Sequence, residues 1–406
     1  NNEYKDAQRA GDAGLIYKDG YIYVGIDGNK NNDGQETHQI IKVNATTGAV
    51  VDGVDISEQI GGQSYLDKMA LVGDLILASS AKTTNGSIAI DISGEKMELI
   101  TDIPGLETGF SGAISPVIGS KVYMMSNNSK GLLEYDVAQQ KVTASNVMTN
   151  SGALQFSDCL VTLDSNADMP GQSLLTFVNT ANAVDLVLYN LQSKKTVTLK
   201  DVTNGKGSGN SLRAIEVSPD GQTVFVSAYG CNHLSVYDVA SGKVKVQYPT
   251  INTQIEGIIL YEDTLYIGNY SSCTASILDL ETGAITKLAQ LGKSPFSQYR
   301  IHATAAGDGK VFFGTAPSSN RWGGCILWYD IAAERVYVAG GPNLEDVYYT
   351  PSGKVKDGSV SNQEWYSVTT GNVALTDSDS KNITNAAGES VQRFTGVVTN
   401  QTVNCM

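Results

Sequence analysis

The sequence predicts an all-β fold, a single β-propeller domain of four-stranded antiparallel blades over residues 1–406. Three observations predict it. Short runs of alternating apolar residues are separated by turn residues, a strand–turn motif recurs about every 40–50 residues, and the sequence carries no helical periodicity of useful length. The clearest copy of the motif is LSVYDVASGKV at 234–244, where apolar alternation leads into Asp238, a small turn, a Lys and a β-branched residue.

One polar residue at the start of each turn marks the repeat. Its side-chain oxygen accepts hydrogen bonds from backbone N–H groups of the turn that follows. Eight copies fit the spacing, with this residue at Asn44, Asp91, Asp136, Asn190, Asp238, Asp279, Asp330 and Asp377. We therefore expect eight blades, with repeat 8 and a closing strand-like run at 390–399 inside 343–406. Because that stretch is the least typical copy, seven blades followed by an irregular C-terminal segment is the alternative.

Each repeat has the same internal order of strands. Two alternating strands, A and B, precede the hairpin of strands C and D, as in GKVFFGTA at 309–316. In a propeller the A–B and C–D turns emerge on one face, and the B–C and D–A loops emerge on the other. The B–C and D–A loops are the longer and less regular ones, which is typical of binding loops. We expect any binding site on this second face, which we call the loop face.

Composition and charge limit the function classes. Hydrophobic residues make up 41% of the chain, which is enough for a packed core and excludes wholesale disorder. The formal net charge of -14 argues against a nucleic-acid partner, since phosphates need a positive field. No apolar run approaches ~18 residues, so we expect no membrane span. The first residues, NNEYKDAQRAGDAG, hold no apolar signal-peptide core, so we expect any export signal to have been removed from this chain.

Arginines and aromatic residues gather on the loop face. The candidate ligand-binding residues are Arg213, Tyr229, Tyr270, Phe296, Tyr299, Arg300, Arg321 and Trp322. Guanidinium groups bind anions through charge-assisted hydrogen bonds and stack on planar rings. In an acidic protein this combination predicts a concave site for a ligand that is anionic and planar or aromatic. Solvated arginines, with aromatic rings that shield the blade ends, are the plainer explanation.

Three cysteines fall into register with the repeat. Cys231, Cys273 and Cys325 precede the turn Asp of their repeats by seven, six and five residues. We therefore expect all three near the start of strand C, at the end opposite the Asp turn. Neighbouring blades could join two of them in a disulfide, which would fit an oxidising compartment. Small buried residues at a hairpin end are the other interpretation, and the pairing of Cys159 and Cys405 stays open.

Catalytic and metal signals are weak. The three histidines, His38, His233 and His302, are spread over repeats 1, 5 and 7, and a three-histidine metal site across the channel is an open alternative. None of the common catalytic motifs is present, and GKGSGNS at 205–211, which contains a G-x-G, precedes no helix that would hold a phosphate. We therefore expect no catalytic residues, no metal and no cofactor, and a protein that is not an enzyme.

Two stretches resemble known propellers. SPDGQTVFVSAYGCNHLSVYDVASGKV at 218–244 resembles the YVTN-type repeat of bacterial surface and periplasmic proteins. The segments DGKVFFGTA, NRWGGCILWYDI, EWYSVTTGNVAL and ITNAAGESVQRFTGVVT of the C-terminal third look like the closing region of propeller lipoproteins from gut Bacteroidetes.

The second resemblance implies a function. Members of that group work beside TonB-dependent outer-membrane transporters and capture scarce metallo-ligands such as ferric siderophores, and related propellers capture cobalamin. It implies an exported, cell-surface or outer-membrane lipoprotein whose ligand is a ferric catecholate siderophore, an anionic and aromatic molecule suited to Arg213, Arg300 and Arg321. The alternatives are a cobalamin-, carbohydrate- or protein-binding propeller and, behind them, a metal-dependent lyase or lactonase.

Overall fold

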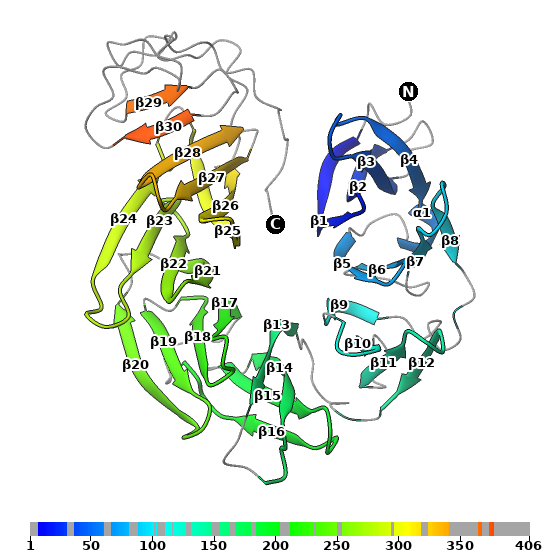
Figure 1. The fold of residues 1–406 in the computed structure, drawn as a ribbon, viewed down its shortest axis with the longest axis horizontal. Coiled ribbons are helices and arrows are strands. Elements are labelled where there is room, and N and C mark those ends of the chain that lie inside the picture. The colour runs from blue at the N-terminus through cyan, green and yellow to red at the C-terminus, as the bar shows by residue number, and fades with distance from the viewer. Residues whose placement is uncertain are drawn as a thin grey trace. The chain divides into compact units, whose positions relative to one another are not determined.

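The structure is a computed structural model, and it falls into two compact units. Unit 1 comprises residues 1–179 and 185–199, and unit 2 comprises residues 180–184 and 200–406. The described residues are 7–30, 36–60, 66–80, 88–100, 103, 110–115, 117–126, 131–145, 147, 155–162, 167–179, 184–203, 212–230, 233–249, 254–293, 296–317, 324–340, 364–367 and 373–376. Each unit is built from antiparallel sheets, one after another along the chain (Figure 1).

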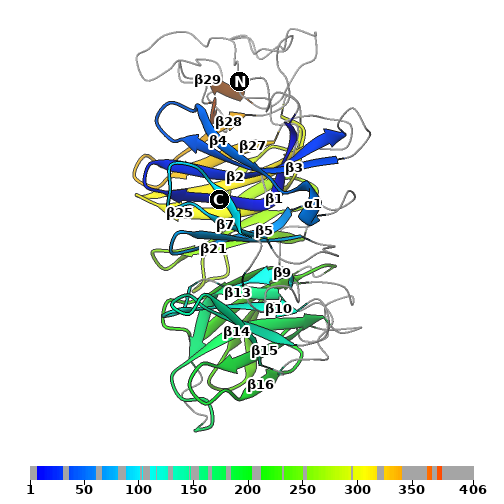
Figure 2. The same cartoon turned by 90° about the vertical axis from the view of Figure 1, so that its right-hand side faces the viewer.

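The first two sheets of unit 1 are blades 1 and 2. Blade 1 has the strand order β1 (Ala7–Lys18), β2 (Tyr21–Lys30), β3 (Glu36–Asn44) and β4 (Val50–Asp55). The short helix α1 (Ser57–Ile60) follows, and blade 2 has the order β5 (Leu66–Val72), β6 (Leu75–Ser80), β7 (Ile88–Asp91) and β8 (Glu98–Ile100). Figure 2 shows β1 to β4 from the side, as neighbours in one twisted sheet.

Blades 3 and 4 complete unit 1. Blade 3 pairs its strands in the order β9 (Phe110–Ile114), β10 (Lys121–Ser126), β11 (Leu132–Asp136) and β12 (Lys141–Ala144). Blade 4 has the order β13 (Gln155–Thr162), β14 (Gln172–Asn179), β15 (Val184–Asn190) and β16 (Thr196–Leu199). In every case strands that follow one another in sequence are neighbours in the sheet, as expected for a meander.

Unit 2 contains blades 5, 6 and 7. Blade 5 has the order β17 (Leu212–Val217), β18 (Thr223–Ala228), β19 (His233–Asp238) and β20 (Lys243–Pro249). Blade 6 has the order β21 (Ile255–Tyr261), β22 (Thr264–Asn269), β23 (Thr274–Leu278) and β24 (Ile285–Gln290). Blade 7 begins with β25 (Gln298–Gly307), β26 (Lys310–Pro317), β27 (Cys325–Asp330) and β28 (Arg335–Gly340).

The preference for eight blades is corrected to seven. In the described part of the chain, two strands within the stretch expected to form the eighth blade, β29 (Glu364–Ser367) and β30 (Val373–Thr376), extend blade 7 instead. β30 pairs with the outer strand β28, which makes blade 7 a six-stranded sheet. An outer strand offers unpaired backbone groups, and a hairpin of the same chain satisfies them. Asp377 and the run at 390–399 lie outside the described residues.

The turn residues of the repeat have the predicted role. In each of the seven blades the Asp or Asn ends strand C, or directly follows it, and its side chain accepts a backbone N–H of the C–D turn. The acceptors are Asn44, Asp91, Asp136, Asn190, Asp238, Asp279 and Asp330. The A–B turn of blade 7 has the other expected geometry, since Asp308 (φ 49) and Gly309 (φ 68) both have positive φ, as in a type I′ turn.

Buried apolar clusters lie between successive blades within each unit. In unit 1, Ile40 of blade 1 shares a cluster with Ile76 of blade 2, and in unit 2, Tyr266 of blade 6 shares one with Phe313 of blade 7. Blade faces therefore pack against one another, as sheets with two apolar faces require. This packing fixes the inner strands of neighbouring blades side by side, and β21 contacts both β17 and β25.

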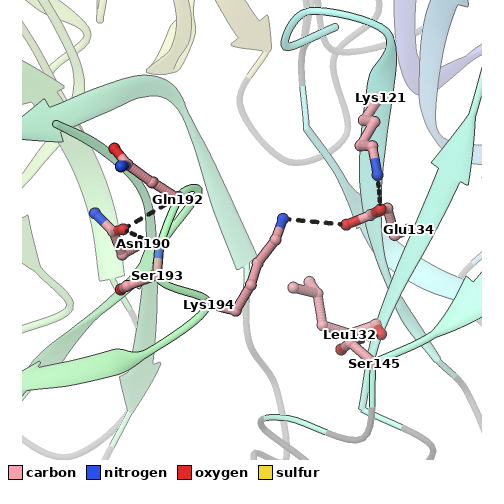
Figure 3. A network of polar contacts seen from close by, with 8 residues as sticks. All are labelled: Lys121, Leu132, Glu134, Ser145, Asn190, Gln192, Ser193 and Lys194. Atoms are coloured by element: carbon pink, nitrogen blue, oxygen red, sulfur yellow. Dashed lines mark hydrogen bonds and ion pairs between the residues drawn. The ribbon is translucent and has the colours of Figure 1, made fainter. Parts of the chain in front are cut away.

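The C–D turn of blade 4 also ties that blade to blade 3 (Figure 3). Asn190 Oδ1 accepts the backbone N–H groups of Gln192 and Ser193, at 3.1 and 2.7 Å. The turn projects Lys194, whose Nζ lies 3.6 Å from Oε2 of Glu134 on β11. Lys121 of β10 contacts the other oxygen of the same carboxylate. Two lysines thus share one partly buried carboxylate at this blade junction.

Candidate functional site

Five of the eight predicted ligand-binding residues come together at one end of blades 5, 6 and 7. They are Arg213, Tyr229, Tyr270, Tyr299 and Arg300, and we call them the arginine–tyrosine cluster. All five belong to unit 2, and they come from the first strand of blades 5 and 7 and from the loops that follow the second strand of blades 5 and 6.

Arg300 stands against two tyrosine rings. Its guanidinium carbon lies 4.5 Å from the ring centroid of Tyr270 and 5.6 Å from that of Tyr299. The two rings meet edge to face at 4.8 Å, and their hydroxyl groups share a hydrogen bond of 2.8 Å. Cation–π contacts of this kind hold a guanidinium in a fixed plane while its outer N–H groups stay accessible. The Arg300 side chain is 27% exposed, so ligands can reach it.

Arg213 and Tyr229 form the second arm of the cluster. The guanidinium carbon of Arg213 lies 5.3 Å from the Tyr229 ring centroid. Both residues are exposed, and Tyr229 is 43% exposed, which is unusual for a large aromatic residue. An exposed aromatic ring next to a cation is typical of a surface that binds something.

A buried carboxylate lies beneath the cluster, and the sequence analysis missed it. Glu256 of β21 has a side chain that is only 2% exposed. Its Oε2 lies 3.5 Å from Nη1 of Arg300 and 3.8 Å from Nδ1 of His302, while its Oε1 accepts a hydrogen bond of 2.6 Å from Gln254. A single acidic residue inside the apolar run IEGIIL at 255–260 was the signal that could have revealed it, since acidic side chains are rarely buried without a partner.

Gln254 connects the two arms to this carboxylate. Its side-chain oxygen accepts the backbone N–H of Gly230, next to Tyr229, at 3.1 Å. Its backbone carbonyl accepts the N–H of Tyr270 at 2.8 Å. Together with the bond to Glu256, these contacts hold the B–C loops of blades 5 and 6 and the start of β21 in one arrangement. Gln254 is 8% exposed, so these bonds are largely protected from water.

Several residues in and next to the cluster lie at irregularities of the inner strands. The pairing registers of β17, β21 and β25 with their second strands each skip one residue near the strand start, namely Arg213, Glu256 and Tyr299. β25 has a second skip at His302. A β-bulge turns its extra residue away from the strict alternation of a strand. The same kind of irregularity thus takes four polar or aromatic residues out of the strict alternation of their strands.

Residues in and next to the cluster have shifted pKa values. Burial raises the pKa of Glu256, and the nearby Arg300 and Arg213 oppose this. Burial, together with Arg300 and Arg213, lowers the pKa of His302 to about 4, so His302 is neutral at pH 7. The hydrogen bond to Tyr299 and burial raise the pKa of Tyr270. Perturbed groups gathered in one place are typical of functional sites.

One further predicted residue, Phe296, does not join the cluster. Phe296 is 1% exposed and lies in the apolar core between blades 6 and 7, where no ligand reaches it. The backbone carbonyl of Phe296 accepts a hydrogen bond from the Gln298 side chain at 2.6 Å. Arg321 and Trp322 lie outside the described residues.

The cysteine and histidine predictions have mixed outcomes. Cys273 and Cys325 lie at the end of strand C opposite the Asp turn, as expected, and both are free thiols buried in the core of blades 6 and 7. Cys231 lies outside the described residues. His38 is buried within β3, His233 is buried at the first residue of β19, and His302 lies in β25, the first strand of blade 7.

The cluster is suited to binding an anion. Among the described residues, no three His, Cys, Asp or Glu side chains gather as a metal site would require. Two arginines, one ionisable carboxylate and a neutral histidine leave a net positive charge when Glu256 is ionised. Rings of three tyrosines flank these charges. Such a surface offers guanidinium N–H donors to an anion and flat faces to a planar group.

The comparisons with known proteins identify the fold. The crystal structure of the computationally designed Ika8 protein aligns with a TM-score of 0.52 and 14% identity over 91% of this chain and 96% of that chain. A chain of the mitotic checkpoint complex aligns with a TM-score of 0.50 and 13% identity over 75% of this chain and 86% of that chain. The chain is a β-propeller.

No protein family model and no curated protein matches the propeller's sequence. Identities of this size show the fold of the propeller alone, because many functions share one fold. In the described residues, no helix of the propeller is long and apolar enough to span a bilayer. Its function is therefore argued from the arginine–tyrosine cluster.

Proposed function

We propose that this propeller is a non-catalytic binding protein that captures an anionic, planar or aromatic ligand at the arginine–tyrosine cluster. The observation that carries the proposal is the pair of arginines, each held against a tyrosine ring, with Arg213 and Tyr229 exposed at the surface. A ligand of this kind gains charge-assisted hydrogen bonds from the guanidinium groups and stacking from the rings.

The narrower proposal is a ferric catecholate siderophore. Such a complex is multiply anionic and its outer surface consists of aromatic rings, so it matches both elements of the cluster. The resemblance of the C-terminal third to propeller lipoproteins of gut Bacteroidetes supports the same ligand. It further supports a place at the cell surface, beside a TonB-dependent transporter that would receive the ligand.

Titration of a ferric tris-catecholate siderophore tests the proposal. We expect micromolar or tighter binding to the wild-type protein, and roughly tenfold or greater weakening in Arg300→Gln, because one charge-assisted hydrogen bond is worth about 1.5–3 kcal/mol. Arg335→Gln is the matched control. Arg335 is exposed at the C–D turn of blade 7, at the opposite end of the blade from Arg300.

Each other outcome has a clear meaning. Equal affinity of wild type and Arg300→Gln would reject the cluster as the site. Absence of siderophore binding, with Arg300-dependent binding of another aromatic anion, would reject only the siderophore. Tight binding of cobalamin that tolerates Arg300→Gln and added salt would favour the cobalamin alternative, since a ligand of small net charge gains little from the arginines.

A further inference from the structure

Glu256 is buried in an unusual way for a carboxylate. Only one of its two oxygens is hydrogen bonded, to Gln254, and no hydrogen-bond donor among the described residues reaches Oε2. Nη1 of Arg300 and Nδ1 of His302 stand 3.5 and 3.8 Å from Oε2, beyond ordinary hydrogen-bond distance. The ionised form of a buried carboxylate is destabilised when one oxygen accepts no hydrogen bond. The ionised form of Glu256 is therefore stabilised mainly by the positive charges of the arginines.

The local fold forces this position on the carboxylate. A methyl group on Gly257 would come within 3.0 Å of Thr304 and 3.3 Å of Ile301, so β21 lies directly against β25 at this point. This close approach, together with the register skip at Glu256, brings the carboxylate beside Arg300 and His302 of the next blade. The packing of β21 against β25 and the bulge at Glu256 thus both keep the Glu256 carboxylate close to the arginines.

We infer that Glu256 is an internal counter-charge that competes with the bound anion for Arg300 and Arg213, so that ligand binding takes up a proton at Glu256. The inference rests on the proposed function. An anion bound to the arginines adds a second negative charge near Glu256. It also reduces the electrostatic stabilisation that the arginines give to the ionised Glu256 carboxylate. Both effects raise the proton affinity of Glu256 in the complex, and by linkage the ligand then binds more tightly as pH falls.

The groups that face Glu256 make it the main source of any such proton. Arg213 from β17 and Arg300 from β25 carry the positive charges of the site. His302, also from β25, has a pKa lowered to about 4 and is neutral in the free site. Gln254, on the approach to β21, has no ionisable group, and the hydrogen bond to Tyr299 raises the pKa of Tyr270, whose phenol therefore keeps its proton at neutral pH. Glu256, whose pKa burial raises, is thus the group best placed to change charge.

The test uses pyrene tetrasulfonate, a planar aromatic anion whose sulfonates stay ionised across the range, with fluorescence anisotropy between about pH 5.5 and about pH 8.5. We expect the wild-type affinity to rise as pH falls, by at most about tenfold per pH unit for one proton. Titration calorimetry in two buffers of different ionisation enthalpy should show uptake of up to one proton. Glu256→Gln should lose both effects, and should bind roughly 3- to 10-fold more tightly than wild type at the highest pH.

Two variants serve as controls. Glu262→Gln changes an exposed carboxylate in the A–B turn of the same blade and should behave as wild type. His302→Gln should keep most of the pH dependence. If Glu256→Gln does not fold, infrared difference spectra of protein labelled with 13C-glutamate replace it, and a protonated carboxyl band should appear when the probe binds.

The outcomes separate the inference from the proposed function. Arg300-dependent binding of the probe with no proton uptake, or with uptake that persists in Glu256→Gln, overturns the inference and leaves the proposed function standing. Loss of the pH dependence in His302→Gln assigns the proton to His302 and also overturns it. Failure of wild type to bind the probe, or binding that does not depend on Arg300, overturns both.

Discussion

Arg300 and Glu256 face each other across neighbouring blades, with Nη1 of the arginine 3.5 Å from Oε2 of the carboxylate. The Glu256 side chain is 2% exposed and the Arg300 side chain is 27% exposed, so the first is buried in the protein and the second is in contact with solvent. The buried negative charge of Glu256 attracts the Arg300 guanidinium and holds it in place. It also reduces the net positive charge that Arg300 presents to a ligand. The candidate site is therefore a pair of arginines with part of their charge already balanced from below.

Salt should weaken ligand binding at the cluster. For an anionic ligand such as pyrene tetrasulfonate, we expect the affinity of wild type to fall as ionic strength rises, because exposed charges are screened within about 10 Å at 0.1 M salt. Arg213→Gln should weaken binding roughly tenfold at low salt and flatten the salt dependence. Arg335→Gln should leave both unchanged. A salt dependence identical in Arg213→Gln and wild type would contradict the assignment of Arg213 to the site.

Gln254 should be needed for stability and for the shape of the site. Gln254→Ala leaves the N–H of Gly230 and one oxygen of Glu256 without their partner, which we expect to cost about 1–3 kcal/mol in the free energy of unfolding. Urea unfolding monitored by circular dichroism measures this. Gln139→Ala, in an exposed C–D turn of blade 3, is the control and should be neutral. Equal midpoints for the two variants would argue against the role of Gln254.

Close packing of the inner strands predicts a sharp difference between two glycines. A methyl group on Gly268 of β22 would lie 2.4 Å from Cγ2 of Ile301, so Gly268→Ala should destabilise the protein by about 1–3 kcal/mol through overpacking. A methyl group on Gly307, at the end of β25, meets nothing within 4 Å among the described residues. Gly307→Ala should therefore be tolerated. Melting temperatures of the two variants decide the matter.

The turn carboxylates should make the protein less stable in acid. Hydrogen bonds from the turns lower the pKa of Asp91, Asp238 and Asp279. A lowered folded-state pKa contributes stability above the unfolded value of about 3.9, and that stability is lost as pH falls through the folded value. The triple Asp→Asn variant should keep the turns, as Asn44 and Asn190 do, and should lose less stability than wild type between about pH 5 and about pH 3. Urea midpoints at the two pH values test this, and parallel losses would contradict it.

The two described thiols should be unreactive in the native protein. Cys273 and Cys325 are fully buried, and burial raises the pKa of both, so little thiolate forms and none is accessible. Iodoacetamide at about pH 8 should leave both unmodified until the protein is unfolded, as peptide mass spectrometry would show. Rapid native labelling of either residue would show that the core of blades 6 and 7 opens easily.

The sequence by itself determined the strands and turns of the repeat. Strand alternation, the turn Asp or Asn and the spacing of the repeat depend on local chemistry, so Asp238 or Asp279 could be assigned from a few neighbouring residues. The arginine–tyrosine cluster could be predicted for a similar reason. The repeat assigns each loop to one end of its blade, so residues of these loops were expected on the same face. The predicted number of blades was wrong because strand pairing uses backbone hydrogen bonds, which depend little on the side chains. The strand pattern at 373–376 therefore does not show that β30 pairs with β28 in blade 7.

Only the tertiary structure decided what lies beneath the arginines. Glu256 and Gln254 are far in sequence from Arg213 and Arg300, and strict strand alternation does not anticipate the bulges that turn these side chains together. Phe296 shows the opposite effect, since a loop aromatic that pattern alone places at the surface is drawn into the core between two blades. Local periodicity specifies strands and turns, whereas the direction of a side chain at a strand end depends on how neighbouring blades pack.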